Sequence, residues 1–395
     1  MTQRILTDWL ESYLKFVESD EPPELFKLWT GLSTIAAVLK RKVFWDWGRY
    51  TAYPNMYVIL VAPPGIGKGR AMTPCEDLLE DISIEVGAHM TSKEGLVKAL
   101  ALTFSNSADG SIGGISMDCA LTIMHPEIVI LFKGNDKELV RLLCELWDCK
   151  KKVPINFVTR DYADLTNVWL NILGGTTPWL LANEFPEEVI SGGFGSRSIF
   201  VYANRKSKSV PFPFLSEEEK ALRKQLVSDL AVLSNVHGEF TATKECLELL
   251  GSFYIENDHN PKFSSRQLEH YNPRRVAHMQ KLCMILSASR SSNLEITTVD
   301  FHRALSILET TEEVMPRVFE GVGRSDLAGM VATIQSFLMR RNQCTKGELL
   351  EEFKFDIDGI ELDKILYAFK MRGVCEAYTE NGLVTYVYVP KGDRK

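Results

Sequence analysis

A short glycine-rich segment carries the strongest chemical signal in this sequence. Residues 62–69 are Ala-Pro-Pro-Gly-Ile-Gly-Lys-Gly, and they follow a continuous apolar run over residues 56–62. Glycines let backbone N–H groups turn inward around phosphates, a lysine reaches the β- and γ-phosphates, and a following helix adds the dipole of its N-terminus. The segment therefore predicts a nucleotide site. The predicted nucleotide-binding residues of the loop are Gly65, Gly67, Lys68 and Gly69.

The loop departs from the full phosphate-binding pattern at two positions. That pattern has glycine where this chain has Ala62, and serine or threonine where it has Gly69. Gly69 removes the hydroxyl that normally binds Mg²⁺. We nevertheless expect ATP and Mg²⁺ as cofactors. The alternative is a glycine-rich turn that arose by chance.

Two further segments could carry catalytic groups beside this loop. Glu127 follows an apolar strand over residues 120–124 and could polarise the attacking water, although Pro126 stands where an aspartate usually lies. Thr176 and Thr177 follow the apolar run of residues 168–173 and could sense the γ-phosphate. The alternatives are a surface role for Glu127 and simple turn or capping chemistry for the two threonines.

Several other motifs occur in a fixed order around the loop. They are Phe26-Lys27-Leu28-Trp29, Arg41-Lys42-Val43, Tyr53-Pro54-Asn55-Met56-Tyr57, Leu143-Cys144-Glu145-Leu146-Trp147-Asp148-Cys149, Leu173-Gly174-Gly175-Thr176-Thr177-Pro178, Gly192-Gly193-Phe194-Gly195-Ser196-Arg197 and Lys281-Leu282-Cys283-Met284. Over residues 5–320 this order resembles a family of phage and prophage P-loop ATPases described as replicative DNA helicases. It is more distantly similar to the AAA+ ring helicases.

The resemblance implies an ATP-dependent DNA helicase or translocase of phage-type replication. Such a protein forms a ring, expected to be hexameric, acts on single-stranded or forked DNA, and works with a primase or another replication protein. An ATP-binding scaffold or helicase loader that hydrolyses poorly is the main alternative, and Gly69 and Pro126 favour it. A DNA-packaging motor is a third, weaker interpretation.

The resemblance also assigns roles to three arginines. Ser196-Arg197-Ser198 is similar to a Ser-Arg-Phe arginine-finger motif, so Arg197 would supply positive charge to a neighbouring subunit's nucleotide. Arg274 and Arg275 begin a predicted helix and would sense nucleotide from a lid. The alternative is an ordinary surface ion pair for Arg197 and a solvated arginine pair for Arg274 and Arg275.

Basic residues between two predicted strands could bind DNA. Lys150, Lys151 and Lys152 precede the first strand and Arg160 lies in the turn. In related ring helicases a hairpin at this point enters the central channel, where positive charge follows the phosphate backbone. A solvated lysine run is the alternative. Residues 325–395 hold ten Lys/Arg against eleven Asp/Glu, so we expect that region to dock on a partner rather than to grip DNA.

The elements that position these residues read as an α/β fold. Strands are predicted over residues 43–49, 56–62, 120–124, 153–159, 166–174 and 198–203, with helices over 5–19, 24–39, 92–103 and 136–147. This alternation is typical of a P-loop NTPase core (AAA+/RecA-like) with a parallel sheet. We expect four parts: an N-terminal helical segment (1–50), the ATPase core (51–210), an all-helical lid (211–320) and a C-terminal winged helix (325–395).

Composition places limits on the function. The formal net charge is −7, so a nucleic-acid site must be a local patch. The eight cysteines form no CxxC pair and no zinc-ligand spacing, which predicts reduced thiols and no metal site of that kind. The sequence has no apolar run of membrane-spanning length. We therefore expect a cytoplasmic protein that does not associate with membranes.

Overall fold

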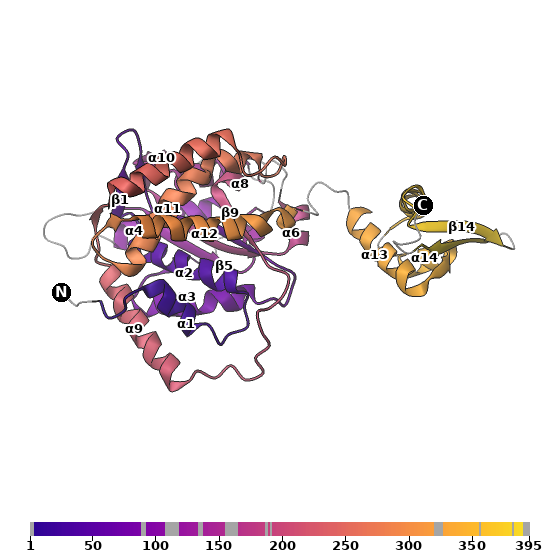
Figure 1. The fold of residues 1–395 in the computed structure, drawn as a ribbon, viewed down its shortest axis with the longest axis horizontal. Helices are drawn as coiled ribbons and strands as arrows, with labels where there is room; N and C mark the ends of the chain where they lie inside the picture. The colour runs from indigo at the N-terminus through magenta and orange to yellow at the C-terminus, as the bar shows by residue number, and fades with distance from the viewer. Residues whose placement is uncertain are drawn as a thin grey trace. The chain divides into compact units, whose positions relative to one another are not determined.

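The computed structural model divides the chain into two compact units, Met1–Phe319 and Glu320–Lys395 (Figure 1). Each unit has its own hydrophobic core. The structure describes residues 4–87, 92–106, 118–132, 137–154, 165–185, 189, 192–319, 327–354, 357–380 and 383–389.

A five-stranded, all-parallel sheet forms the centre of the first unit. Its order is β4 (Val86–Gly87), β5 (Ala120–His125), β8 (Trp169–Thr176), β3 (Tyr57–Val61) and β9 (Ser198–Tyr202). All five residues of β3 are buried, as expected for a strand covered on both faces. The predicted α/β class and parallel sheet are confirmed.

Helices surround this sheet, and the early ones follow from the sequence. Asp8 caps α1 by accepting the amide N–H of Glu11, and Pro23 precedes α2. Helices α2, α3, α4 and α5 all pack against strands of the sheet. Figure 1 labels α2, α3 and α4 beside the sheet. Among the described residues up to 197, the helices are α1 (Trp9–Phe16), α2 (Glu24–Leu39), α3 (Lys68–Asp81), α4 (Lys93–Asn106), η1 (Ile128–Phe132), α5 (Lys137–Trp147), α6 (Pro178–Glu184) and α8 (Gly193–Arg197).

The single strand predicted over residues 166–174 is wrong. Asn167 adopts a left-handed backbone conformation with φ +47°, which divides the segment. Before it, β7 (Leu165–Thr166) pairs antiparallel with β6 (Lys152–Val153), and after it β8 joins the main sheet. The expected hairpin pairing is therefore present at its base, while most of its first strand and its turn lie outside the described residues.

Residues 216–319 are mainly helical, as predicted, with three two-residue strands. The helices are α9 (Glu217–Leu233), α10 (Lys244–His259), η2 (Glu269–Arg274), α11 (Arg275–Arg290), α12 (Thr298–Val314) and η3 (Met315–Phe319). The strands β10 (Gly238–Glu239), β11 (Thr241–Ala242) and β12 (Glu295–Ile296) are too short to show a two-residue periodicity. β10 pairs with β1 (Val43–Asp46), which also pairs with β2 (Thr51–Ala52), so this region is joined to the N-terminal part.

The buried carboxylate of Asp229 binds residues 4–6 to this helical region. Asp229 of α9 is fully buried and accepts the amide N–H groups of Ile5 (2.7 Å) and Leu6 (3.1 Å). The guanidinium of Arg4 pairs with the same carboxylate at 3.3 Å and also donates to the carbonyl oxygen of Ala288 in α11 at 2.8 Å. One side chain thus satisfies several buried donors that the chain brings from far apart in sequence.

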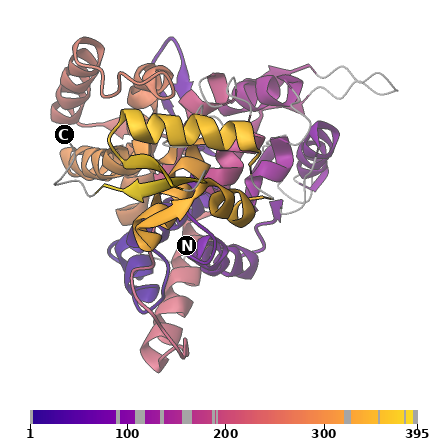
Figure 2. The ribbon, with the colours of Figure 1, turned by 90° about the vertical axis from the view of Figure 1, so that its right-hand side faces the viewer.

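In its described residues, the second unit contains the helices α13, α14 and α15 and a three-stranded antiparallel sheet. Figure 2 shows these helices and strands. The predicted order of helix, helix, helix and hairpin is present, with one additional strand after the first helix. Glu380 pairs with Leu383 across the predicted Asn-Gly turn. The elements are α13 (Leu327–Arg341), β13 (Gln343–Thr345), α14 (Lys346–Glu352), α15 (Gly359–Met371), β14 (Cys375–Glu380) and β15 (Leu383–Tyr388).

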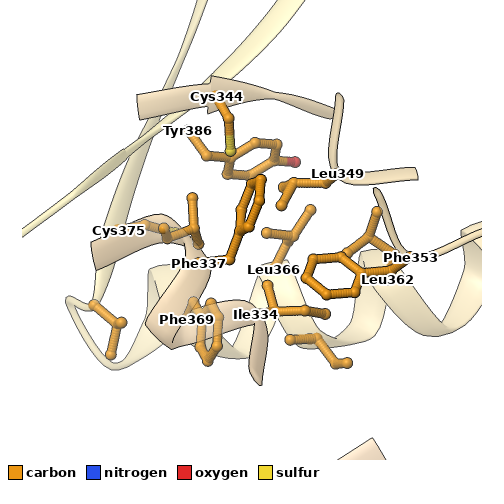
Figure 3. Packing of buried hydrophobic residues seen from close by; sticks show 13 residues of the cluster. Ile334, Phe337, Cys344, Leu349, Phe353, Leu362, Leu366, Phe369, Cys375 and Tyr386 are labelled. Atoms are coloured by element: carbon orange, nitrogen blue, oxygen red, sulfur yellow. The ribbon is translucent and has the colours of Figure 1, made fainter. Parts of the chain in front are cut away.

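Aromatic and aliphatic side chains from all three helices fill the core of the second unit (Figure 3). Phe337 of α13 packs edge-to-face on Phe353, with ring centroids 5.5 Å apart. Cys344 and Tyr386, from paired strands, close the other side of the cluster. This core lies entirely within the residues that follow 319, which explains why the unit is compact on its own.

We expect Asp229→Ala to destabilise the first unit by about 3 kcal/mol or more, because it leaves the N–H groups of Ile5 and Leu6 without their acceptor and the guanidinium of Arg4 without its buried carboxylate partner. Urea unfolding followed by circular dichroism measures this change. The matched control is Asp258→Ala, which removes an exposed carboxylate from α10 and should change the free energy of unfolding by less than about 0.5 kcal/mol. Equal effects of the two variants would contradict this role of Asp229.

Candidate functional site

The glycine-rich loop leaves the carboxyl end of β3 in a conformation that only glycine adopts easily. Gly65 has φ +81° and Gly67 has φ +95°. Gly67 is the N-cap of α3 and provides no side-chain acceptor. The first N–H groups of this 14-residue helix therefore have no capping side chain, and their dipole favours an anion in front of the loop.

Lys68 folds back over the loop. Its Nζ donates to the carbonyl oxygens of Ala62 (2.7 Å) and Pro63 (3.2 Å). Burial lowers the pKa of Lys68, and the negative charge of Glu127 opposes this shift. The lysine and the predicted catalytic carboxylate therefore act on each other electrostatically within one site.

Two glycines at the end of β8 set the position of Glu127. A Cβ atom at Gly174 would lie 2.6 Å from the Cβ of Ile128, and one at Gly175 would overlap the carbonyl oxygen of Pro126. The turn after β5 can therefore lie directly against β8 only because both residues lack side chains. This requirement links the Gly174–Gly175 pair to the geometry of the site.

The loop, the turn after β5 and the end of β8 together enclose a cavity of about 730 Å³. The volume lies in the range of small-molecule sites. Its lining residues are Glu21, Pro64, Gly65, Gly67, Lys68, Gly69, Arg70, His125, Pro126, Glu127, Thr176, Thr177, Leu180 and Lys206.

The predicted catalytic residues Glu127, Thr176 and Thr177 all line this cavity. The amide N–H of Glu127 donates to Nδ1 of His125 at 3.0 Å, so this ring nitrogen acts as the acceptor. The hydroxyl of Thr177 accepts the amide N–H of Leu180 at 3.2 Å and caps α6. Thr177 therefore also performs the capping role that the sequence left as an alternative.

Two cations in the cavity were not singled out from the sequence. Arg70 lies in the first turn of α3, and Lys206 follows β9. Glu21 contacts both of them, at 3.2 Å from Nη1 of Arg70 and 2.7 Å from Nζ of Lys206. Asp20 pairs with Nη2 of Arg70 at 2.6 Å. No local motif marks these residues, because the pairing joins three segments that are distant in sequence.

The side chains present do not fit a magnesium ion held by the protein at the usual two positions. Those positions carry Gly69 and Pro126, and a Cβ atom at residue 69 would lie 3.5 Å from the Cβ of Pro126. Mg²⁺ prefers oxygen ligands in octahedral geometry, and neither side chain offers an oxygen. Within the described ranges, no group of three or more His, Cys, Asp or Glu side chains could hold a metal ion.

Arg197 lies at the opposite end of the parallel strands from the glycine-rich loop. It directly precedes β9, whose first residue pairs with Tyr57 at the start of β3, so it lies about 15 Å from the loop at roughly 3.3 Å per strand residue. Its guanidinium is buried and pairs with Asp148 at 3.1 Å. Arg197 therefore does not reach the cavity of its own chain in this conformation, and a role in a neighbouring subunit stays a prediction.

The two predicted lid arginines do not line the cavity either. Arg274 lies near Arg197, with both guanidinium groups over the ring of Trp147 at 5.7 Å and 5.5 Å from its centroid. Arg275 is buried and forms a bidentate ion pair with Glu312. Its Nε and Nη2 donate to the two carboxylate oxygens at 2.7 Å and 2.9 Å. The alternative of a solvated arginine pair is therefore wrong for Arg275, which lies in a buried ion pair.

The predicted DNA-binding lysines lie at the base of the β6–β7 hairpin. Lys150, Lys151 and Lys152 are exposed, and Nζ of Lys150 lies 3.9 Å from the carboxylate of Glu145. Arg160 lies outside the described residues. The lysines are therefore accessible to a large anionic partner.

Comparison with known proteins adds no assignment: no family model matches the chain, and no curated protein matches it significantly. Among the helices that the structure describes, none is both long and apolar enough to cross a membrane.

We expect Gly175→Ala to destabilise the first unit by about 1–3 kcal/mol, because the added methyl group overlaps backbone that the turn after β5 cannot easily move. The control is Gly251→Ala in α10, where a Cβ atom meets nothing within 4 Å. That change should be neutral or stabilising, since alanine favours helices over glycine. Thermal unfolding of the two variants tests the claim, and an unaffected Gly175→Ala would contradict the close approach.

Proposed function

We propose that the first unit is a P-loop NTPase core of the AAA+/RecA-like kind, and that the chain is an ATP-dependent, ring-forming DNA helicase or translocase. One observation carries the proposal: the glycine-rich loop and the N-terminus of α3, which has no capping side chain, border a cavity that Lys68 and Glu127 also line. A triphosphate matches this arrangement of positive groups, in which Glu127 faces the loop from the turn after β5.

Three of the cavity residues have specific parts in the proposed reaction. Lys68 exchanges its two carbonyl acceptors for phosphate oxygens, a charge-assisted interaction that is stronger than the bonds it replaces. Glu127 polarises the attacking water. Thr176 ends β8 at the same edge and orients the water or the γ-phosphate. No step of this scheme passes through a metal ion.

The ring assembly rests on Arg197. We propose that it acts on the nucleotide of a neighbouring subunit in a hexameric ring, which requires it to exchange Asp148 for phosphate on assembly. Arg274, which lies over the same tryptophan ring, would approach that nucleotide with it. In this proposal the helices of residues 211–319 form the lid, and the second unit is a winged helix.

We propose that single-stranded or forked DNA follows the β6–β7 hairpin. The exposed Lys150, Lys151 and Lys152 support a phosphate-tracking role without sequence preference. The second unit is nearly balanced in charge, which supports docking on a neighbour, a primase or another replication protein.

A second function remains supported by one observation. Gly69 and Pro126 remove both usual magnesium ligands, which favours an oligomeric ATP-binding scaffold or helicase loader that hydrolyses poorly. DNA-stimulated ATPase activity separates the two proposals. Stimulation by single-stranded DNA supports the motor, whereas nucleotide binding without turnover supports the scaffold.

We expect Glu127→Gln to bind ATP with unchanged affinity and to lose hydrolysis by about 100-fold or more, because an amide cannot accept a proton from water. Steady-state turnover and equilibrium binding are measured on the same preparation. The control is Glu245→Gln, an exposed residue of α10. Turnover equal to that of the parent protein would assign the reaction to another carboxylate.

We expect replacement of Lys150, Lys151, Lys152 and Arg160 by alanine to lower DNA affinity and to flatten its dependence on salt. The variant makes fewer phosphate contacts, so its binding releases fewer counterions from the DNA. ATP binding without DNA should not change. Deletion of residues 325–395 should reduce affinity less than the four substitutions do. Fluorescence anisotropy over a range of salt, with ring assembly checked for each variant, measures this. The reverse ranking would make the second unit the main DNA-binding part.

A further inference from the structure

We infer that the cavity holds the phosphates of its nucleotide with three protein cations, Lys68, Arg70 and Lys206, and without a magnesium ion held by the protein. The inference rests on the proposed function, since it concerns the same nucleotide site. It starts from the pairing of Gly69 with Pro126, which lie side by side where oxygen ligands for Mg²⁺ would be required.

The charge of the cavity is consistent with this inference. Bound divalent cations usually supply the largest positive charge in a phosphate site. Here the lining contains the cations of Lys68, Arg70 and Lys206 against the carboxylates of Glu21 and Glu127. The positive end of the α3 dipole adds to the three cations. Asp20, which does not line the cavity, also pairs with Arg70. Within the lining itself, a polyphosphate therefore meets three cations and two carboxylates.

Asp20 and Glu21 position the cations of Arg70 and Lys206 beside the cavity. Of these two cations, Asp20 pairs only with Arg70. Glu21 accepts from Lys206 at 2.7 Å, from Arg70 at 3.2 Å and from the amide N–H of Val210 at 2.9 Å. The hydrogen bond from Lys206 is the main reason that the pKa of Glu21 is lowered, followed by the one from Val210. Both cations are thus oriented before a nucleotide binds, which reduces the entropy lost on binding.

The backbone around Glu21 fixes this arrangement relative to the phosphate loop. The amide N–H of Ser207 donates to the carbonyl oxygen of Glu21 at 3.0 Å, and its hydroxyl donates to the carbonyl oxygen of Pro22 at 2.9 Å. Pro22 in turn lies against Gly67, whose Cβ position is 3.5 Å from its Cγ. Glu21 and Pro22 therefore connect the glycine-rich loop to the segment that carries Lys206.

Both cations can move from the acids to a phosphate. The side chains of Arg70 and Lys206 are 36% and 38% exposed, so neither is locked in the core. Surface ion pairs of this exposure contribute little to stability. A phosphate group that carries more charge than one carboxylate can therefore compete for them.

The structure leaves room for a side chain at residue 69, so packing does not require glycine there. The Cβ position of Gly69 is 3.5 Å from Pro126, which is ordinary van der Waals contact, and its φ is not in the left-handed region. Serine can therefore occupy this position without displacing its neighbours. This makes Gly69→Ser with Pro126→Asp a usable variant that restores both oxygen ligands.

Isothermal titration calorimetry of the full chain with ATP, in EDTA and in excess Mg²⁺, tests the inference. We expect the two dissociation constants to agree within about threefold, a difference of less than about 0.7 kcal/mol. The Gly69→Ser, Pro126→Asp variant should bind at least about tenfold more tightly with Mg²⁺ than with EDTA. A loss of tenfold or more in EDTA for the parent protein would overturn the inference.

The cation variants separate this inference from the proposed function. In EDTA, Lys206→Ala and Arg70→Ala should each weaken ATP binding by about tenfold, with folding checked by circular dichroism. The matched control, Lys208→Ala, removes an exposed lysine of the same segment that does not line the cavity and should leave the affinity unchanged. If Lys206→Ala behaves like Lys208→Ala while ATP still binds, the inference fails and the nucleotide site stands. Absence of ATP binding in both buffers would overturn the proposed function itself.

Discussion

Parallel pairing of β3 with its two neighbours is the constraint on which the candidate site depends. The register aligns Val61 with Thr176 on one side and with Tyr202 on the other. The segments that follow these residues must therefore emerge at one edge of the sheet. They carry the phosphate loop, Thr177 and Lys206, and the turn after β5 joins them because the Gly174–Gly175 pair lets it approach β8. The same register puts Arg197 at the far edge, so any action on a nucleotide must involve another subunit.

Ion pairs and hydrogen bonds position the cations at this end of the sheet. Lys68 is satisfied by two carbonyl groups of its own loop, while Glu21 and Asp20 satisfy Arg70 and Lys206. These partners keep the cations in place and are weaker acceptors than a polyphosphate. The site is consequently organised before a ligand arrives, and the N-terminal corner that supplies the acids is part of the site rather than a separate segment.

Much of the fold follows from local sequence patterns, whereas long-range pairings do not. The apolar run of β3, the glycines of the loop and the alternation of strands and helices predicted the parallel sheet and the position of Lys68. Sequence spacing could not reveal that Glu21 joins Arg70 to Lys206, or that Arg275 is buried against Glu312, because each pairing depends on tertiary packing. The break at Asn167 was missed because a left-handed residue inside an apolar segment leaves the hydrophobic pattern almost unchanged.

The central claim is that the loop of residues 62–69 binds nucleotide phosphates, and equilibrium binding of ATP to Lys68→Ala tests it most directly. The account predicts that this variant, correctly folded, loses at least about 100-fold in affinity, because the phosphates lose the cation that the loop itself provides. Lys98→Ala, an exposed lysine of α4, should bind like the parent protein. Equal affinity of Lys68→Ala and Lys98→Ala for ATP would contradict the account.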